Sequence, residues 1–388
     1  MRSFKYFLAE SKETKLKHIE HAEDHPINDG SEGFQHAVGA LHVAHEHIKN
    51  QRKDSGLTMK YDGSPSLVYG HHPKTGKFFV ASKSAFNVNP KINYSDADIE
   101  KNHGHAPGLV HKLKAALEHL PKVAPKKGVY QGDVMFSHDD KKEDDHGNLS
   151  FTPNTITYTA KKGTPDHDQV SHAKFGIVTH TQYHGSDIES MHASPHPDLH
   201  KFTRHKDVYH KSAEQDTSKV NYSPEDEKEF RQHLGAAGKI HAAHGESLYS
   251  HLDKNRDHVK TYINQTVRTG EAPSVEGLRD HIAQKYNKEI DKVKTDASKS
   301  KKRAELQVHH EHLDKHKKEI KHLFDMHSHI QKAKNVLVNV LNRNQGGLSH
   351  SIDGKKSNPE GFVVHHEGQP TKLVDRAEFA RANLLRVR

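Results

Sequence analysis

The spacing of apolar residues predicts a helix near the start of the chain. Between residues 31 and 52, large apolar side chains recur at intervals of four, three and seven, which places them on one face of a helix. Ser31 is the expected N-cap of this helix, because its hydroxyl can accept a bond from the first turn. The apolar positions are Phe34, Val38, Leu41 and Ile48.

From residue 56 to about residue 185 the pattern changes to short β-rich runs separated by turns. A helix over residues 109–120, ended by Pro121, interrupts these strands. An acidic loop over residues 139–145 separates two of them. The expected strands cover residues 57–61, 67–69, 77–81, 129–136, 155–160 and 175–181.

Residues 186–345 are rich in Lys, His and Glu and poor in aromatic residues, and their pattern predicts helices. Ser223 followed by Pro224 is typical of a helix start, and Ser274 precedes a second helix. The longest expected helix runs from about residue 301 to residue 342. The insertion is either a solvated helical spacer or a clamp that lays Lys, Arg and His side chains along phosphates.

These patterns divide the chain into four parts. We expect an N-terminal helical segment over residues 1–54, the first part of a sheet-rich core over 55–185, the helical insertion over 186–345 and the second part of the core over 346–388. Strands return in this last part, at residues 360–364 and 372–374. The expected fold class is therefore α+β, with antiparallel sheets and a large all-helical insertion.

Composition narrows the classes of protein to which the chain could belong. A net charge of +8 favours a polyanionic partner. The absence of cysteine excludes a disulfide scaffold and a thiolate metal site. No run of residues approaches the ~18 apolar residues of a membrane span, so we expect no membrane partner.

Histidine is unusually frequent, with 40 residues in a chain of 388. Adjacent pairs such as His309-His310 and His365-His366 are compatible with metal binding. We nevertheless interpret the histidines as solvated residues that tune the charge, because they show no recurrent ligand spacing. The net positive charge should then rise steeply below about pH 6.5, where unperturbed imidazoles take up protons.

Residues 1–10 read MRSFKYFLAE. They resemble the short capsid-targeting leaders of large tailed bacteriophages, which end in Leu-x-Glu, where a head-maturation protease cuts. The corresponding residues here are Leu8-Ala9-Glu10. This resemblance implies a protein packaged in a phage head, and the alternative is an ordinary first helix.

Residues 60–66, Lys-Tyr-Asp-Gly-Ser-Pro-Ser, carry the most informative chemical motif. Lys60 lies at the end of an expected strand that enters a turn, a place where a rigid sheet often holds a catalytic side chain. A lysine amine attacks phosphorus only when it is neutral, which at neutral pH requires partial burial or neighbouring cations. The runs that follow are GKFFVASKS (76–84), GVYQGDVMF (128–136), KFGIV (174–178), EGFVV (360–364) and Lys372.

In this order the runs resemble the motifs of the covalent nucleotidyltransferases, which include ATP-dependent polynucleotide ligases and capping enzymes. The resemblance covers residues 55–185 and 350–380 and implies an antiparallel-sheet adenylation domain. It implies that Lys60 takes AMP from ATP with Mg²⁺ or Mn²⁺ as cofactor, and that Glu360 and Asp133 hold the metal. The other implied nucleotide-binding residues are Thr58, Asp62, Gly63, Lys83, Phe175 and Lys372, besides Asp133 and Glu360 themselves.

The chain departs from this family pattern in three places. Asp133 stands where the family usually has glutamate, and Lys372 stands alone where the family usually has two lysines. The residues after Lys372 leave no room for the β-barrel that follows this motif in nick-sealing ligases, so we expect no C-terminal β-barrel. Phe175 is either an adenine platform or a core residue, and Lys60 without the later motifs would be a surface lysine in a hairpin turn.

The resemblance implies a ligase that joins 5′-phosphate and 3′-hydroxyl ends through a lysine-AMP intermediate. Asp62 favours DNA, whereas Ser64 directly after Gly63 is found in RNA ligases, so RNA or mixed substrates stay open. We expect nicked or splinted duplex ends as partners, a monomer, and a location in the cytoplasm of an infected bacterial host. The alternatives are an RNA ligase proper, a capping guanylyltransferase that uses GTP, and a catalytically decayed phage nucleic-acid-binding or head protein.

Overall fold

The computed structural model describes residues 19–52, 56–195, 197–343 and 347–376, and these residues fall into two compact units. The sheet unit consists mainly of residues 50–220 and 342–370, and the helical unit of residues 20–49, 221–341 and 371–376. Leu8-Ala9-Glu10, the predicted cleavage motif, lies outside the described residues.

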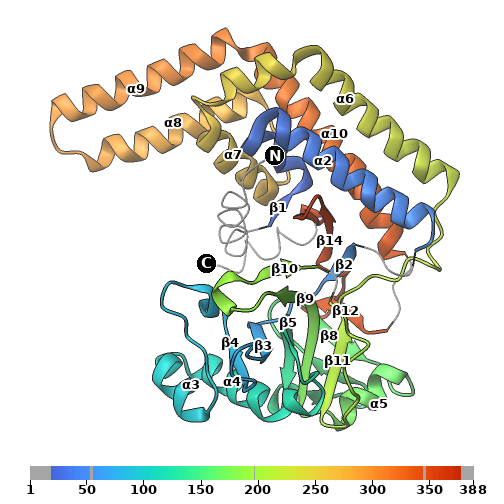
Figure 1. Ribbon diagram of the computed structural model, residues 1–388. Helices are drawn as coiled ribbons and strands as arrows, with labels where there is room; N and C mark the ends of the chain where they lie inside the picture. Colours follow the sequence, from blue (N-terminus) through green and yellow to red (C-terminus); the bar gives the residue numbers. More distant parts are fainter. Residues whose placement is uncertain (1–18, 53–55, 196, 344–346, 377–388) are drawn as a thin grey trace. The chain divides into compact units, whose positions relative to one another are not determined.

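A six-stranded sheet forms the centre of the sheet unit (Figure 1). Its order is β10-β9-β5-β3-β4, with antiparallel pairs throughout, and β11 pairs with β9 in parallel. The motif runs 128–136 and 174–178 therefore lie on adjacent strands, β5 and β9, and the run 76–84 contains the edge strand β4. The strands are β3 Ser66–His71, β4 Phe78–Ala81, β5 Gly128–Ser137, β9 Phe175–His184, β10 His192–Ser194 and β11 Val208–Ser212.

Helix α4, Pro107–His119, packs on one face of this sheet. Val110 and Leu113 of α4 are buried in one apolar cluster with Tyr130 and Val134 of β5. Because side chains alternate along a strand, Asp133 lies between these positions on the opposite face of the sheet. The face away from α4 is therefore the one that carries polar side chains from the motifs.

Two smaller sheets complete the strand content, and all three sheets of the described residues are open. One places β2, Leu57–Lys60, antiparallel to β14, Gly361–His366. Strand β15, Gln369–Leu373, pairs in parallel with β1, Glu20–His21. The other consists of β6 Lys142–Glu143, β7 Leu149–Phe151, β8 Thr157–Ala160, β12 Ser349–Ile352 and β13 Lys355–Lys356. Two short helices, α3 Asp96–His103 and α5 Pro165–His172, also belong to the sheet unit.

The helical unit contains six of the nine α-helices in the described residues. Helices α8 and α9 lie side by side as a hairpin, and α2 packs on α6 (Figure 1). Within the described ranges, no helix has the length and apolar character needed to cross a membrane. The helices are α2 His25–Lys49, α6 Pro224–Leu252, α7 Arg256–Thr269, α8 Val275–Lys292, α9 Asp296–Lys315 and α10 Lys317–Asn342.

The structure confirms the mixed α and β fold with antiparallel sheets and the predicted helix starts. Ser223 caps α6 in a capping box with Asp226, and Ser274 caps α8. Gly30 has non-helical backbone angles (φ 61°, ψ −130°) and divides α2, so that its longer part begins next to Ser31.

The structure differs from the predicted organisation in three places. The helix predicted over residues 301–342 is two helices, because His316 leaves helical geometry (φ −115°, ψ 28°) between α9 and α10. The helical unit resumes at residue 221 rather than 186, because β10 and β11 complete the large sheet. The polar sequence of β11, VYHKS, gave no strand pattern. Residues 20–49 also belong to the helical unit instead of forming a separate segment.

The interpretation of the histidines as solvated residues is wrong for many of them. Burial lowers the pKa of His25, His210, His258 and His350 to about 4, with nearby cations or histidines adding to the effect for three of them. These imidazoles stay neutral well below pH 6.5. The positive charge therefore rises over a lower and wider pH range than the sequence indicated.

Candidate functional site

Lys60 is the last residue of β2, and β14 holds it next to Glu360. Gly361 is the direct partner of Lys60 in the antiparallel pair, so the residue before it reaches the same end of the two strands. The Lys60 ammonium forms an ion pair with the Glu360 carboxylate. The two side chains are 27% and 12% exposed, so the pair is shielded but still open to solvent on one side. The motif at residues 60–66 and the motif at residues 360–364 therefore lie next to each other in the fold.

The turn after Lys60 is anchored by the carboxylate of Asp62. Its Oδ1 accepts a hydrogen bond from Asn154 Nδ2 at 2.8 Å. Its Oδ2 accepts bonds from the backbone amides of Thr155 at 2.6 Å and Ile156 at 2.8 Å. The Asp62 amide in turn donates to the hydroxyl of Tyr158 at 2.7 Å. Asp62 therefore fixes the turn that carries Lys60 against the strand β8 and the residues before it.

Gly63 allows this turn to lie directly against β5. A Cβ at position 63 would lie 2.6 Å from Cβ of Asp133 and 3.0 Å from the carbonyl oxygen of Val134. Backbone bonds hold the approach: the Ser64 amide donates to Val134 O at 2.9 Å, and the Val134 amide donates to Pro65 O at 3.0 Å. Glycine is required here because no side chain fits between the turn and Asp133.

Asp133 lies on β5 opposite Ser66 of β3, and the imidazole of His180 approaches it from β9. The distance from His180 Nε2 to Asp133 Oδ1 is 3.6 Å. Burial alone would raise the pKa of Asp133, but His180, Ser66 and the charge of Lys60 outweigh it and hold that pKa below its usual value. Asp133 is therefore an ionised carboxylate beside the Lys60 amine at neutral pH.

Sequence reasoning missed His180. It falls in the strand predicted over residues 175–181, and a histidine there belongs to none of the motifs. The pairing of β9 with β5 is what brings the imidazole to Asp133. The sequence offers no clear indication, because His180 stands among other polar residues, Thr179 and Thr181, where the apolar run ends.

Two further predicted residues lie on or next to strands of the sheet unit. Thr58 is buried in β2 opposite Val363, and its hydroxyl donates to the carbonyl oxygen of Val363 at 3.4 Å. Lys83 is exposed and begins the short helix η2, Lys83–Phe86, just after β4. Because Ala81 pairs with Val68, the chain at Lys83 has reached the end of the sheet that also carries Ser66.

Phe175 and Lys372 are placed differently. Phe175 is 0% exposed and belongs to the apolar cluster under α4, so its ring offers no free face for an adenine. Of the two interpretations of Phe175, the structure supports the core residue. Lys372 lies on β15 opposite His21, in the helical unit, and its proximity to Lys60 stays a prediction.

The carboxylates of Glu360 and Asp133 are compatible with a magnesium site, although they do not form a complete one. Mg²⁺ is commonly held by one or two protein carboxylates together with phosphate oxygens of a bound nucleotide. Both carboxylates act on the same lysine, which fits this arrangement. Over the described ranges, the one group of three metal-ligating side chains lies elsewhere and consists of His251, His316 and Glu319.

A pocket of about 460 Å³ opens on the α4 side of the large sheet. Lys114 and Glu118 of α4 line it together with Ser137 and His138. None of the residues predicted for nucleotide binding is among its lining residues. The polar cluster around Lys60, rather than this pocket, is therefore the candidate site.

Comparison with known proteins finds no match among curated proteins and none among solved structures. A family model described as a family of unknown function, DUF6267, matches residues 16–388. The matched region contains Lys60, Asp133 and Glu360 and spans both units. The chain therefore belongs to this family, DUF6267, whose function is unknown.

Proposed function

We propose that this protein is an ATP-dependent nucleic-acid ligase that carries AMP covalently on Lys60. The observation that supports the proposal most strongly is the convergence of three motifs that are far apart in sequence. Lys60 is paired with Glu360, the residue before β14, and Asp133 of β5 interacts with the charge of Lys60. A structural lysine in a hairpin turn has no need of two carboxylates from separate sheets.

The first chemical step is attack by the Lys60 nitrogen on the α-phosphorus of ATP. A phosphorus–nitrogen bond forms, the bond to the bridging oxygen breaks, and pyrophosphate leaves. In the structure the Lys60 amine is held by the Glu360 carboxylate, so Glu360 has to release Lys60 before the amine, as a neutral nucleophile, can attack. A divalent cation bound by Glu360 and Asp133 would offset charge on the pyrophosphate.

The surrounding residues keep the nucleophile in position. Asp62 and Gly63 fix the turn against β5, and this limits the movement of Lys60 relative to Asp133. His180 and Ser66 keep Asp133 ionised. In the later steps AMP passes to a 5′-phosphate, and a 3′-hydroxyl then attacks that phosphate and displaces AMP. The proposed substrates are nicked or splinted ends of DNA, with RNA and mixed ends as the alternative.

The test is the intact mass of the full chain after incubation with ATP and Mg²⁺. We expect the wild type to gain one adenylyl group and Lys60→Ala to gain none. Lys122→Ala is the matched control, because Lys122 and Asp207 form an ion pair of the same kind, 29% and 14% exposed, in the same unit. The control should be labelled like the wild type.

Three other outcomes would separate the alternatives. Labelling of Lys60→Ala to the level of the wild type would contradict the proposal. A guanylyl adduct from GTP without an adenylyl adduct would indicate the capping reaction. The absence of an adduct with either nucleotide, in protein first treated with pyrophosphate to remove any bound AMP, would favour a scaffold that has lost its activity.

A further inference from the structure

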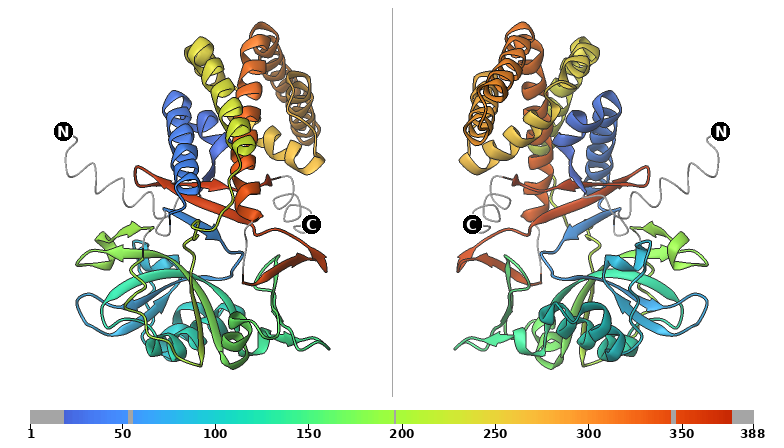
Figure 2. Two further views of the ribbon diagram at one scale, coloured as in Figure 1. Left: turned by 90° about the vertical axis from the view of Figure 1, so that its right-hand side faces the viewer. Right: turned by 90° about the vertical axis from the view of Figure 1, so that its left-hand side faces the viewer.

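Histidines from α6 meet histidines at or near α10 in three separate pairs. The rings of two pairs stack, and the third pair is joined through Nδ1 atoms 3.1 Å apart. The two helices run in opposite directions (Figure 2), and the residue numbers of the pairs rise along α6 as they fall toward the start of α10. The pairs are His233 with His329, His244 with His322, and His251 with His316.

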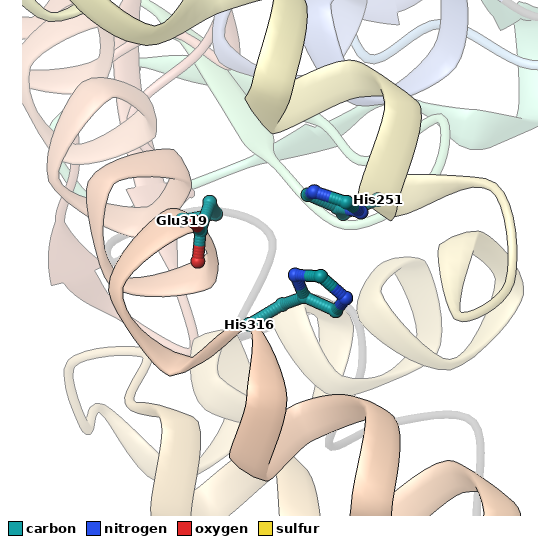
Figure 3. Close-up of side chains that lie close together, drawn as sticks. All are labelled: His251, His316 and Glu319. Carbon is teal, nitrogen blue, oxygen red and sulfur yellow. The ribbon is translucent and has the colours of Figure 1, made fainter.

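The last of these pairs has a carboxylate beside it. Ligand atoms of His251, His316 and Glu319 all lie within 4.8 Å of one another. Figure 3 shows the three side chains gathered from separate segments: the last turn of α6, the residue between α9 and α10, and the first turn of α10. All three are partly exposed, so an ion has a path from solvent.

We propose that His251, His316 and Glu319 form a binding site for a divalent transition-metal ion, and that Zn²⁺ is the ion that the site suits best. Two imidazoles and one carboxylate are a common set for zinc, with a water molecule in the fourth position. Hard cations such as Mg²⁺ and Ca²⁺ prefer oxygen ligands throughout, so two nitrogen ligands select against them.

The neighbouring histidine His312 supports the arrangement. Its Nε2 lies 2.9 Å from the backbone carbonyl oxygen of His251, so this nitrogen carries the proton and donates. The bond ties α9 to the end of α6 next to the cluster.

The stacked rings also define what must change when a metal binds. The centroids of the His251 and His316 rings lie 3.6 Å apart, with an interplanar angle of 22°. Imidazoles that bind one ion approach it by their edges, so one ring has to turn out of the stack. The bound ion would then join α6 to the junction of α9 and α10, at the point where His316 interrupts the helix. The proposed role of the site is therefore structural: the bound ion would hold helices of the helical unit together.

The test is calorimetric titration of Zn²⁺ into the full chain, without an affinity tag and after removal of metals with EDTA. The ligand variants are His251→Ala, His316→Ala and Glu319→Gln. His322→Ala is the matched control, because it removes one ring of another stacked pair between the same helices. Absorption of bound Co²⁺ in the visible range reports the coordination, and circular dichroism in EDTA checks that each variant is folded.

We expect one tight Zn²⁺ site in the wild type and in His322→Ala. Each ligand variant should weaken this site by at least about tenfold, the loss that follows even from disturbing an outer partner of a metal ligand. Equal weakening in His322→Ala, or binding in Glu319→Gln as tight as in the wild type, would overturn the proposal. Either result would mean that scattered histidines bind the metal without a defined site.

Discussion

At the scale of single residues, the candidate site depends on how closely the Lys60 turn approaches β5. Gly63 is the residue that permits this approach, and Asp133 is the residue it meets. The turn that carries Lys60 therefore packs directly on the strand that carries Asp133, although the two residues are far apart in sequence. A larger residue at position 63 should therefore slow adenylylation only by displacing Lys60 relative to Asp133.

We predict that Gly63→Ala reduces the rate of adenylylation at least about tenfold, since the added Cβ displaces the turn and a small misplacement of reacting groups is costly. Gly108→Ala is the control, because a Cβ at Gly108 meets nothing within 4 Å. The measurement is the time course of AMP incorporation by intact mass. Equal rates in the two variants would show that the close approach has no catalytic consequence.

At the scale of elements, a buried ion pair attaches the short helix η1, Ala22–Asp24, to α10. Lys334 Nζ lies 2.7 Å from Glu23 Oε1, and both side chains are 0% exposed. Next to this pair, Arg376 donates to Asp24 at 2.9 Å. Charge therefore joins η1, near one end of the described chain, both to α10 and to Arg376 at the other end.

We predict that Lys334→Met lowers the free energy of unfolding of the helical unit by about 3–5 kcal/mol, because it leaves the buried Glu23 carboxylate with only the more distant Arg376 at 4.0 Å. Lys321→Met removes an exposed pair with Asp325 on the same helix and should cost less than about 1 kcal/mol. Urea unfolding followed by circular dichroism measures both. Similar losses in the two variants would contradict the assigned role of burial.

The sequence predicted elements whose determinants are local. Caps such as Ser223 and Ser274, and most strands of the sheet unit, follow from turn residues and apolar spacing. The motif order also identified Lys60, Asp133 and Glu360, which the fold brings together. His180 and the His251 cluster could not be predicted, because their partners come from other strands and helices and histidine has no fixed place in a hydrophobic pattern.

At the scale of the whole molecule, buried histidines make the stability of the fold depend on pH. Burial holds the pKa of His25, His210, His258 and His350 at about 4 in the folded chain, whereas an unfolded histidine has a pKa near 6.5. Between these values the unfolded chain binds more protons than the folded chain. The stabilisation is therefore complete above about pH 6.5 and is lost as the pH falls to about 4.

We predict that the free energy of unfolding decreases continuously from pH 7 to about pH 4, by on the order of 1–3 kcal/mol for each such histidine. Urea unfolding at a series of pH values measures this dependence. A His350→Gln variant should show a shallower decrease than the wild type. Constant stability across this range would contradict the burial of these imidazoles as neutral groups.

The most direct test of the central claim is to map the adduct that forms when the full chain is incubated with ATP and Mg²⁺. The protein is digested, and the modified peptide is identified by tandem mass spectrometry under conditions that preserve a phosphorus–nitrogen bond. We expect a single adenylyl group on the side chain of Lys60. AMP on a different residue, or no adduct in protein first cleared with pyrophosphate, would contradict it.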